Sequence, residues 1–307
     1  MRTAVLFLIF NRPDTTIRVF ETIRQAKPPR LYVAADGPRK NKVGEKEKCE
    51  EVRSIIKKVD WDCEVKTLFR DENLGCGKAV SQAITWFFEN EEEGIILEDD
   101  CVPSFPFFSY CEYLLGKYKY DTRVWMVSGS CFEENISSLT EYDYLFTKYG
   151  NIWGWASWRR CWNHYDLLMK DYNLFIKEGG FNNICSSKEA KCFTQMYGKL
   201  SKDINLPSST WDYQWFLTRL MNGLSIVPTL NLVENIGEYG AHYNGGSSLI
   251  NKKASEKYNI STEPHFVMVN KRYENLHFYK YYYKSICNKL LTNLLRKSSY
   301  VINKMLK

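Results

Sequence analysis

The sequence has no long hydrophobic run and no cysteine framework. Its first apolar run, Ala4 to Phe10, is far shorter than the about 20 residues that a membrane-spanning helix needs, and no cleavage-site pattern follows it. The ten cysteines contain no Cys-x-x-Cys pair and no regular spacing, which argues against a disulfide framework and a zinc cluster. Reduced thiols in a cytoplasmic protein are the simpler interpretation, so we expect the protein to act where it is made.

The sequence also has only a small excess of positive charge. The formal net charge of +6 over 307 residues is too weak and too scattered to predict nucleic-acid binding, although it suits an anionic small molecule or a membrane surface. Hydrophobic residues make up 44% and charged residues 25%, as in ordinary globular proteins. The length predicts one large domain, or one domain with an appendage.

Two common nucleotide-binding fingerprints are missing as well. In the glycine loop Gly75-x-Gly77, Val80 stands where the dinucleotide fingerprint requires glycine or alanine. Glu72 stands where the phosphate loop requires its first glycine, and Ala79 replaces the Ser or Thr of that loop. NAD binding and a Walker-type ATPase are therefore disfavoured.

What the sequence does contain is a regular alternation of short apolar runs with segments of helical periodicity. The predicted strands are 4–10, 31–35, 64–69, 95–97 and 124–128. This alternation predicts an α/β fold, with a mostly parallel, doubly wound sheet flanked by helices. Right-handed crossovers bring the loops after such strands to one edge, so we expect Arg12, Asp36, Gly75–Lys78 and Glu98–Asp100 to converge there.

The most informative stretch is the apolar run Ile95–Leu97 with the three acids that follow it. Side chains alternate along a strand, so Glu98 and Asp100 are expected on one side and Asp99 on the other. Clustered carboxylates in the crevice beyond a parallel strand suit a hard cation such as Mg²⁺ or Mn²⁺. The alternative is a solvated acidic turn.

Several further residues are candidates for binding or catalysis. Arg12 and Lys78 are candidates for phosphate or base contacts, with a solvated surface charge as the alternative for each. Asp212 begins a predicted helix among aromatic residues; the helix dipole alone explains an acid there, or its surroundings raise its pKa and make it a general base. The glycine-rich and aromatic segment 237–246, which contains His242, has the composition of a lid or of a long surface loop.

Two regions depart from the alternating pattern. The run Trp153-Gly154-Trp155-Ala156-Ser157-Trp158 is dense in tryptophan, and we expect most of these rings in the core and one beside an acceptor site. From Lys271 onward, apolar residues recur at near-helical spacing among lysine and arginine. Such a basic amphipathic tail, 271–307, either lies on an anionic membrane face or packs on the domain.

Together these motifs resemble the glycosyltransferases of the GT-A fold, in particular bacterial relatives of the N-acetylglucosaminyltransferase I type, whose metal motif reads Glu-Asp-Asp. The resemblance covers most of residues 3–246. It rests on Asn11-Arg12-Pro13, Ala35-Asp36-Gly37, the helix from Gly75, Leu97-Glu98-Asp99-Asp100 followed by Pro103 and Phe107-Phe108, and Trp211-Asp212. It implies a GT-A domain over 1–270, with a nucleotide-sugar half (1–130) and an acceptor half (131–270), followed by the helical tail.

The resemblance also implies roles for single residues. Arg12 and Asp36 would hold the nucleotide, Asp36 through the uracil, and Glu98 and Asp99 would contact ribose and sugar. Asp100 would be the direct ligand of Mn²⁺ or Mg²⁺. In the same way Asp212 would be the catalytic base, and His242 would reach the diphosphate or the metal.

The implied activity is metal-dependent, inverting transfer of a sugar from a UDP-sugar to a hydroxyl of a glycan or lipid-linked oligosaccharide, in cell-surface polysaccharide synthesis. The expected place is the cytoplasm, with the tail suited to peripheral contact with the inner face of the membrane. Two alternatives stay open. A sugar nucleotidyltransferase shares the sheet and the cation, although no glycine-rich loop with a basic residue directly follows the first strand. A non-catalytic carbohydrate-binding protein also shares the fold.

Overall fold

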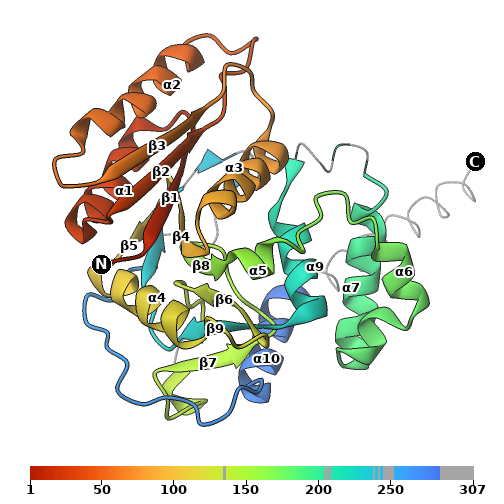
Figure 1. Ribbon diagram of the computed structural model, residues 1–307. Coiled ribbons are helices and arrows are strands. Elements are labelled where there is room, and N and C mark those ends of the chain that lie inside the picture. The colour runs from red at the N-terminus through yellow and green to blue at the C-terminus, as the bar shows by residue number, and fades with distance from the viewer. Residues whose placement is uncertain are drawn as a thin grey trace, which may run out of the picture. The chain divides into compact units, whose positions relative to one another are not determined.

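A computed structural model describes residues 1–133, 136–203, 205, 209–237, 239–240, 243–244 and 252–283 (Figure 1). The chain divides into two compact units. The first comprises Met1–Met169 and Ile204–Asn270, and the second comprises Lys170–Asp203 and the chain from Lys271 onward. The predicted division at residue 130 stays a prediction, and most of the predicted tail, from residue 284, lies outside the described residues.

The first unit is built on a central sheet. Its strands are β1 (Ala4–Ile9), β2 (Arg30–Ala35), β3 (Glu64–Phe69), β4 (Glu93–Glu98), β6 (Val124–Ser128), β7 (Tyr144–Thr147), β8 (Trp155–Trp158) and β9 (Leu224–Pro228). They form an eight-stranded sheet in the order β3-β2-β1-β4-β8-β6-β9-β7. β3, β2, β1 and β4 are parallel, as are β6 and β9, while β8 and β7 are antiparallel to their neighbours. The predicted mostly parallel α/β fold is confirmed.

Helices connect these strands and cover the sheet (Figure 1). Those of the first unit are α1 (Pro13–Ala26), α2 (Glu45–Arg53), α3 (Cys76–Asn90), α4 (Phe105–Lys117), α5 (Arg159–Trp162) and α9 (Asp212–Asn222), with short 3-10 turns at Ser54–Lys58 and Ile136–Ser138. Two small antiparallel pairs complete it, β5 (Cys101–Pro103) with β10 (Val233–Asn235) and β11 (Tyr239–Gly240) with β12 (Tyr243–Asn244).

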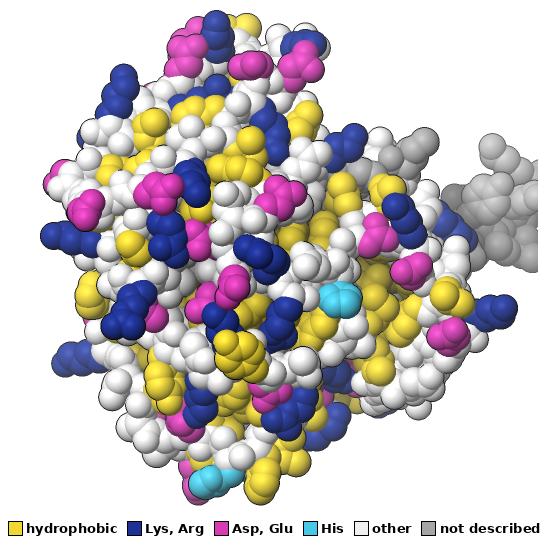
Figure 2. Space-filling view, viewed as in Figure 1, with side chains coloured by type: hydrophobic (Ala, Val, Ile, Leu, Met, Phe, Trp, Pro, Cys, Tyr) yellow, Lys and Arg dark blue, Asp and Glu magenta, His cyan; other side chains and the backbone are white. Residues whose placement is uncertain are grey.

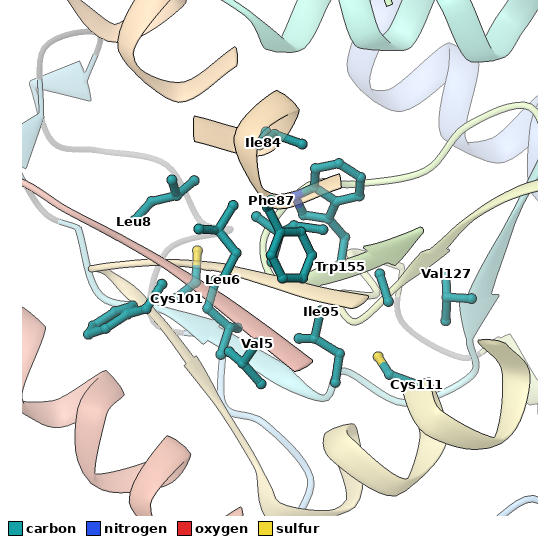
Figure 3. Close-up of a cluster of buried hydrophobic side chains, with 14 of the residues drawn as sticks. Val5, Leu6, Leu8, Ile84, Phe87, Ile95, Cys101, Cys111, Val127 and Trp155 are labelled. Atoms are coloured by element: carbon teal, nitrogen blue, oxygen red, sulfur yellow. The ribbon is translucent and has the colours of Figure 1, made fainter. Parts of the chain in front are cut away.

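The core lies on both faces of the sheet, which is why β1 and the segment Ile95–Leu97 of β4 are continuously apolar rather than alternating. Figure 3 shows Ile84 and Phe87 of α3 on the same side of these strands as Trp155, with Cys111 of α4 on the other. Gly94 permits this packing, because a Cβ there would lie 2.2 Å from the Phe87 ring. The core therefore fixes β4 and, with it, the position of the acids that follow.

The tryptophan-rich run forms β8 and is mostly core, as expected. Trp155 is fully buried and packs its ring against Trp162, Trp211 and Trp215, with centroid distances of 6.2, 5.9 and 5.6 Å. Trp211 directly precedes α9 and Trp215 lies in its first turns, so this aromatic cluster holds the start of that helix. Trp153 is half-buried and lies against Phe132, at 4.7 Å between ring centroids.

The second unit is helical. It contains α6 (Tyr172–Lys177), a 3-10 turn (Gly180–Asn183), α7 (Ser187–Leu200), α10 (Lys271–His277) and a π-helical segment (Phe278–Tyr283). Ser186 and Glu189 form a capping box that begins α7. Aromatic contacts join its parts; Phe193, for example, meets Phe278 at 6.3 Å between ring centroids.

None of the described helices is both long and apolar enough to span a bilayer. Figure 2 shows Lys and Arg side chains interspersed with Asp and Glu over one face, in keeping with the modest net charge.

Candidate functional site

Arg12 and the acids after β4 meet where two neighbouring parallel strands end. Arg12 Nη1 donates to Asp100 Oδ2 at 2.9 Å, and Nη2 donates to Asp99 Oδ1. The backbone N–H of Phe10 also donates to Asp99 Oδ2, at 3.3 Å. A turn begins at Asp99, so the strand alternation predicted for these acids ends there, and one guanidinium reaches both Asp99 and Asp100. Burial alone would lower the pKa of Arg12, but the charges of the two aspartates raise it.

Glu98, the last residue of β4, lies in a strongly negative environment. Burial is the largest cause that raises its pKa to about 8, and the charges of Asp100, Asp99 and Asp212 add to it, while Arg12 opposes them. Burial likewise raises the pKa of Asp99 to about 6. With this pKa Glu98 is mostly protonated at neutral pH, while Asp99 and Asp100 share the single guanidinium of Arg12. A cation bound here would favour the ionised form of Glu98.

The chain returns to this cluster after β10. Pairing of β10 with β5 leads to a hydrogen bond from the Ile236 N–H to the Asp100 carbonyl oxygen, at 2.9 Å. Gly237 then lies so close to Asp100 that a Cβ would be 2.3 Å from its Oδ2. Only glycine fits this approach. The predicted lid segment therefore begins in contact with Asp100, while His242 itself lies outside the described residues.

Asp36 follows β2 and holds a neighbouring loop. Its carboxylate accepts backbone N–H groups from Gly37 at 2.9 Å, Leu74 at 3.0 Å and Gly75 at 3.1 Å. Burial raises the pKa of Asp36 despite these hydrogen bonds. The carboxylate thereby fixes the loop that leads into α3. A uracil contact by Asp36 stays a prediction. The carboxylate would have to make this contact while it still accepts the three backbone N–H groups.

Cys76, the first residue of α3, shows which of the predicted residues come together. Burial, followed by the charges of Glu98, Asp212 and Asp36, raises the pKa of the Cys76 thiol to about 12, and Arg12 opposes them. Residues from four separate strand or helix ends therefore lie within electrostatic range of one side chain. A thiol with this pKa stays protonated at neutral pH and is a poor nucleophile.

Lys78 is placed differently. Its side chain is exposed on the first turn of α3, and its ammonium forms no ion pair with any residue that the structure describes. The structure shows it as a solvated charge beside the loop. A phosphate contact by Lys78 stays a prediction.

Thr210 holds Asp212 at the start of α9, and Tyr165 holds the residue before it. Thr210 Oγ1 donates to Asp212 Oδ1, and the Tyr165 hydroxyl donates to the carbonyl oxygen of Trp211 at 3.1 Å. Tyr165 is itself fixed by face-to-face stacking on Trp162, with ring centroids 4.2 Å apart. Asp212 is half-buried and in electrostatic range of Glu98, a position that suits a base as well as a helix-terminal acid.

The oxygen atoms around Asp100 determine whether a divalent cation fits this site. In the described ranges, no group of three or more His, Cys, Asp or Glu side chains is arranged to hold a metal ion. Asp100 Oδ2 contacts Arg12, and Oδ1 accepts a weak hydrogen bond from Cys101 Sγ at 3.4 Å. One carboxylate combined with substrate phosphates and water is a common way to hold Mg²⁺. Asp100 fits that arrangement as the one protein ligand of a cation that is bound together with a sugar-nucleotide substrate.

Three residues of this site were not predicted as contacts: Tyr165, Thr210 and Gly237. Gly237 had a signal in the sequence, because it opens the glycine-rich segment that was predicted as a lid. The other two act through packing or a local hydrogen bond, for which neither spacing nor composition gives a signal.

Comparisons with known proteins give limited information. No family model and no curated protein sequence matches this chain. Similar solved structures include HddC from Yersinia pseudotuberculosis (12% identity, TM-score 0.35, 53% of this chain and 80% of that one). Others are the mannosyltransferase PcManGT from Pyrobaculum calidifontis in complex with GDP-Man and Mn²⁺ (14%, 0.36, 53% and 46%) and 4-diphosphocytidyl-2C-methyl-D-erythritolsynthase from Anaerococcus prevotii (10%, 0.32, 64% and 99%). At such TM-scores these likenesses establish neither a family nor an activity for this chain.

Proposed function

We propose that the protein is a divalent-cation-dependent, inverting glycosyltransferase. It transfers a sugar from a UDP-sugar to a hydroxyl of a glycan or lipid-linked glycan acceptor during cell-surface polysaccharide synthesis. The choice of UDP and of the acceptor rests on the resemblance of the Glu-Asp-Asp motif and its flanks to the N-acetylglucosaminyltransferase I type.

The observation that carries the proposal is the convergence of Glu98, Asp99, Asp100, Asp212 and Arg12 at the carboxyl ends of parallel strands. In open α/β sheets this edge is the usual place for a ligand. The acids around Asp100 outnumber the one guanidinium, so an anionic sugar nucleotide alone would be repelled there. A divalent cation that comes with the nucleotide would offset this repulsion and favour the ionised form of Glu98.

In this complex Asp100 would hold the cation, which stabilises the negative charge that develops on the leaving diphosphate. Arg12 would contact the nucleotide, and Glu98 and Asp99 would bind ribose and sugar hydroxyls. Asp212 would accept the proton of the acceptor hydroxyl. A single attack on the anomeric carbon from the side opposite the diphosphate inverts its configuration, by the stereochemical logic of inverting glycosidases.

The test is product analysis with UDP-sugars and Mn²⁺, on the wild type and on Asp212→Asn. The variant should lose about 10²-fold or more of the transfer rate, as expected for removal of a general base, and keep UDP affinity close to that of the wild type. Glu47→Gln is the matched control, because Glu47 is an exposed acid in the first turn of α2, and its activity should be unchanged.

Three results would count against the proposal. Normal turnover by Asp212→Asn removes this residue from the mechanism. Release of pyrophosphate instead of UDP identifies a nucleotidyltransferase. Glycan binding that needs no Mn²⁺, without turnover of any sugar nucleotide, identifies a carbohydrate-binding protein.

A further inference from the structure

A groove in the first unit lies apart from the acidic cluster. It has a volume of about 430 Å³ and lies between α4 and the segment 258–263, which runs beside that helix (Figure 1). The residues that matter for its chemistry are Ser109, Tyr110, Tyr113, Tyr258, Ser261 and Glu263. It shares no residue with the site around Asp100, and the proposed transfer reaction makes no use of it.

The far wall of this groove is fixed by Asp143. Asp143 Oδ2 accepts the backbone N–H groups of Ser261 and Thr262, each at 2.7 Å, and its carbonyl oxygen accepts the Tyr258 hydroxyl. The Tyr258 ring meets Tyr110 of α4 edge to face, with centroids 5.5 Å apart and planes at 82°. The two walls are thus held in place by the protein itself, as in a preformed binding site.

The charge within the groove is balanced. Glu263 accepts the Tyr113 hydroxyl at 2.6 Å and forms an ion pair with Lys117, at the edge of the groove. None of the described residues that line the groove is a lysine or an arginine. A phosphorylated or sulfated ligand would therefore meet a paired carboxylate and no free cation, which disfavours anions.

Apart from the paired carboxylate, the groups that a ligand would meet in the groove are mainly aromatic rings and hydroxyl groups. Tyr113 is 48% exposed, so part of it is available to a ligand. Ser109 and Ser261 donate their hydroxyl protons to Pro106 and Asp143, so their oxygens are available as acceptors. Tyrosine combines an apolar ring with a polar end. A sugar ring has the matching character, with C–H groups on its faces and hydroxyls around its edge. The volume lies in the usual range of about 300–1,000 Å³ for small-ligand sites.

We infer that this groove binds a neutral saccharide unit, separately from the acidic site. The inference goes beyond the proposed transfer, since it requires neither nucleotide nor cation. For an enzyme that acts on glycans, such a groove would hold a part of the chain away from the reacting hydroxyl and raise its local concentration.

The test is saturation-transfer difference NMR on the full chain, without nucleotide or metal. The probes are maltotriose, cellotriose and chitotriose, with a sulfated heparin disaccharide as the anionic comparison. We expect saturable binding of at least one neutral trisaccharide and no binding of the heparin fragment. Tyr113→Ala should weaken that binding by up to about tenfold, in line with the worth of one aromatic contact.

Matched variants make the test specific. Tyr120→Ala should bind as the wild type does, because Tyr120 is 86% exposed and does not line the groove. Tyr113→Phe keeps the ring and should keep most of the affinity, and Asp212→Asn should bind normally even if the proposed transfer is wrong. Equal binding by Tyr113→Ala, binding of the heparin fragment alone, or no binding of any trisaccharide would overturn the inference.

Discussion

Replacement of Arg12 by methionine should destabilise the ligand-free protein. The change removes the only guanidinium that contacts Asp99 and Asp100 in the described part of the chain, and the Asp99 side chain is only 5% exposed. Removing one partner of a buried ion pair costs about 3–5 kcal/mol. Because the Arg12 side chain is 30% exposed, the lower end applies. With an unfolding entropy of about 2.1 cal/mol/K per residue, a loss of about 3 kcal/mol corresponds to a fall in Tm of roughly 5 °C for 307 residues.

The same variant tests the link between Arg12 and the cation. Without the guanidinium, Mn²⁺ can take its place beside Asp100, so Mn²⁺ alone should raise the Tm of Arg12→Met more than that of the wild type. The assay is differential scanning calorimetry without nucleotide, with and without Mn²⁺. Arg24→Met is the control, because the Arg24–Asp60 pair is 43% and 52% exposed and screened by water, so its loss should change the Tm little.

The reasoning would be refuted by either of two results. One is a loss of stability in Arg12→Met no larger than in Arg24→Met. The other is an equal effect of Mn²⁺ on the variant and the wild type, which would mean that guanidinium and cation do not compete for the same carboxylates.

Other substitutions test the remaining parts of the site. Asp36→Ala removes the acceptor of three backbone N–H groups and should cost about 2 kcal/mol in urea unfolding, whether or not uracil binds there; an unchanged midpoint would contradict this role. Gly237→Ala places a Cβ 2.3 Å from Asp100 Oδ2 and should weaken Mn²⁺-dependent UDP binding in calorimetry, so wild-type affinity would contradict the close approach. Since the pKa of Glu98 is raised from 4.5 to about 8, the folded state holds its proton more tightly than the unfolded state does. This contribution to stability is therefore present at low pH and is lost as the pH rises from about 4.5 through about 8. In Glu98→Gln the Tm should fall less over this pH range than in the wild type. An equal fall in Tm in both proteins would contradict the raised pKa of Glu98.

The first half of the fold was readable from the sequence. The strands β1, β2 and β4 contain short apolar runs followed by Pro13, Asp36 or Asp99, and the helices between the strands have clear periodicity. β8 was not predicted, because all of its residues are buried, including Trp155 and Trp158, and it shows no alternation. Its antiparallel insertion between β4 and β6 depends on long-range pairing, for which the local sequence carries no signal.

The candidate site was readable in outline and not in detail. Strand ends and crossover handedness were enough to predict that Arg12 and the acids would lie at one edge. The direct ion pairs between Arg12 and the two aspartates were not predicted. From the sequence, Arg12 was assigned to a phosphate or base and the acids to a cation. In the ligand-free protein, the guanidinium and the carboxylates pair with each other because their charges are opposite. The hydrogen bonds of Asp36 depend on the path of the loop at Leu74, and no motif specifies that path.

The measurement that tests the central claim most directly is a calorimetric titration of the protein with UDP, GDP, CMP and dTDP, each with and without Mn²⁺. We predict that UDP binds and that it does so only with the cation, because the carboxylates around Asp100 repel the free diphosphate. If no nucleotide binds under either condition, the acids after β4 serve the structure alone, and the proposed function is wrong.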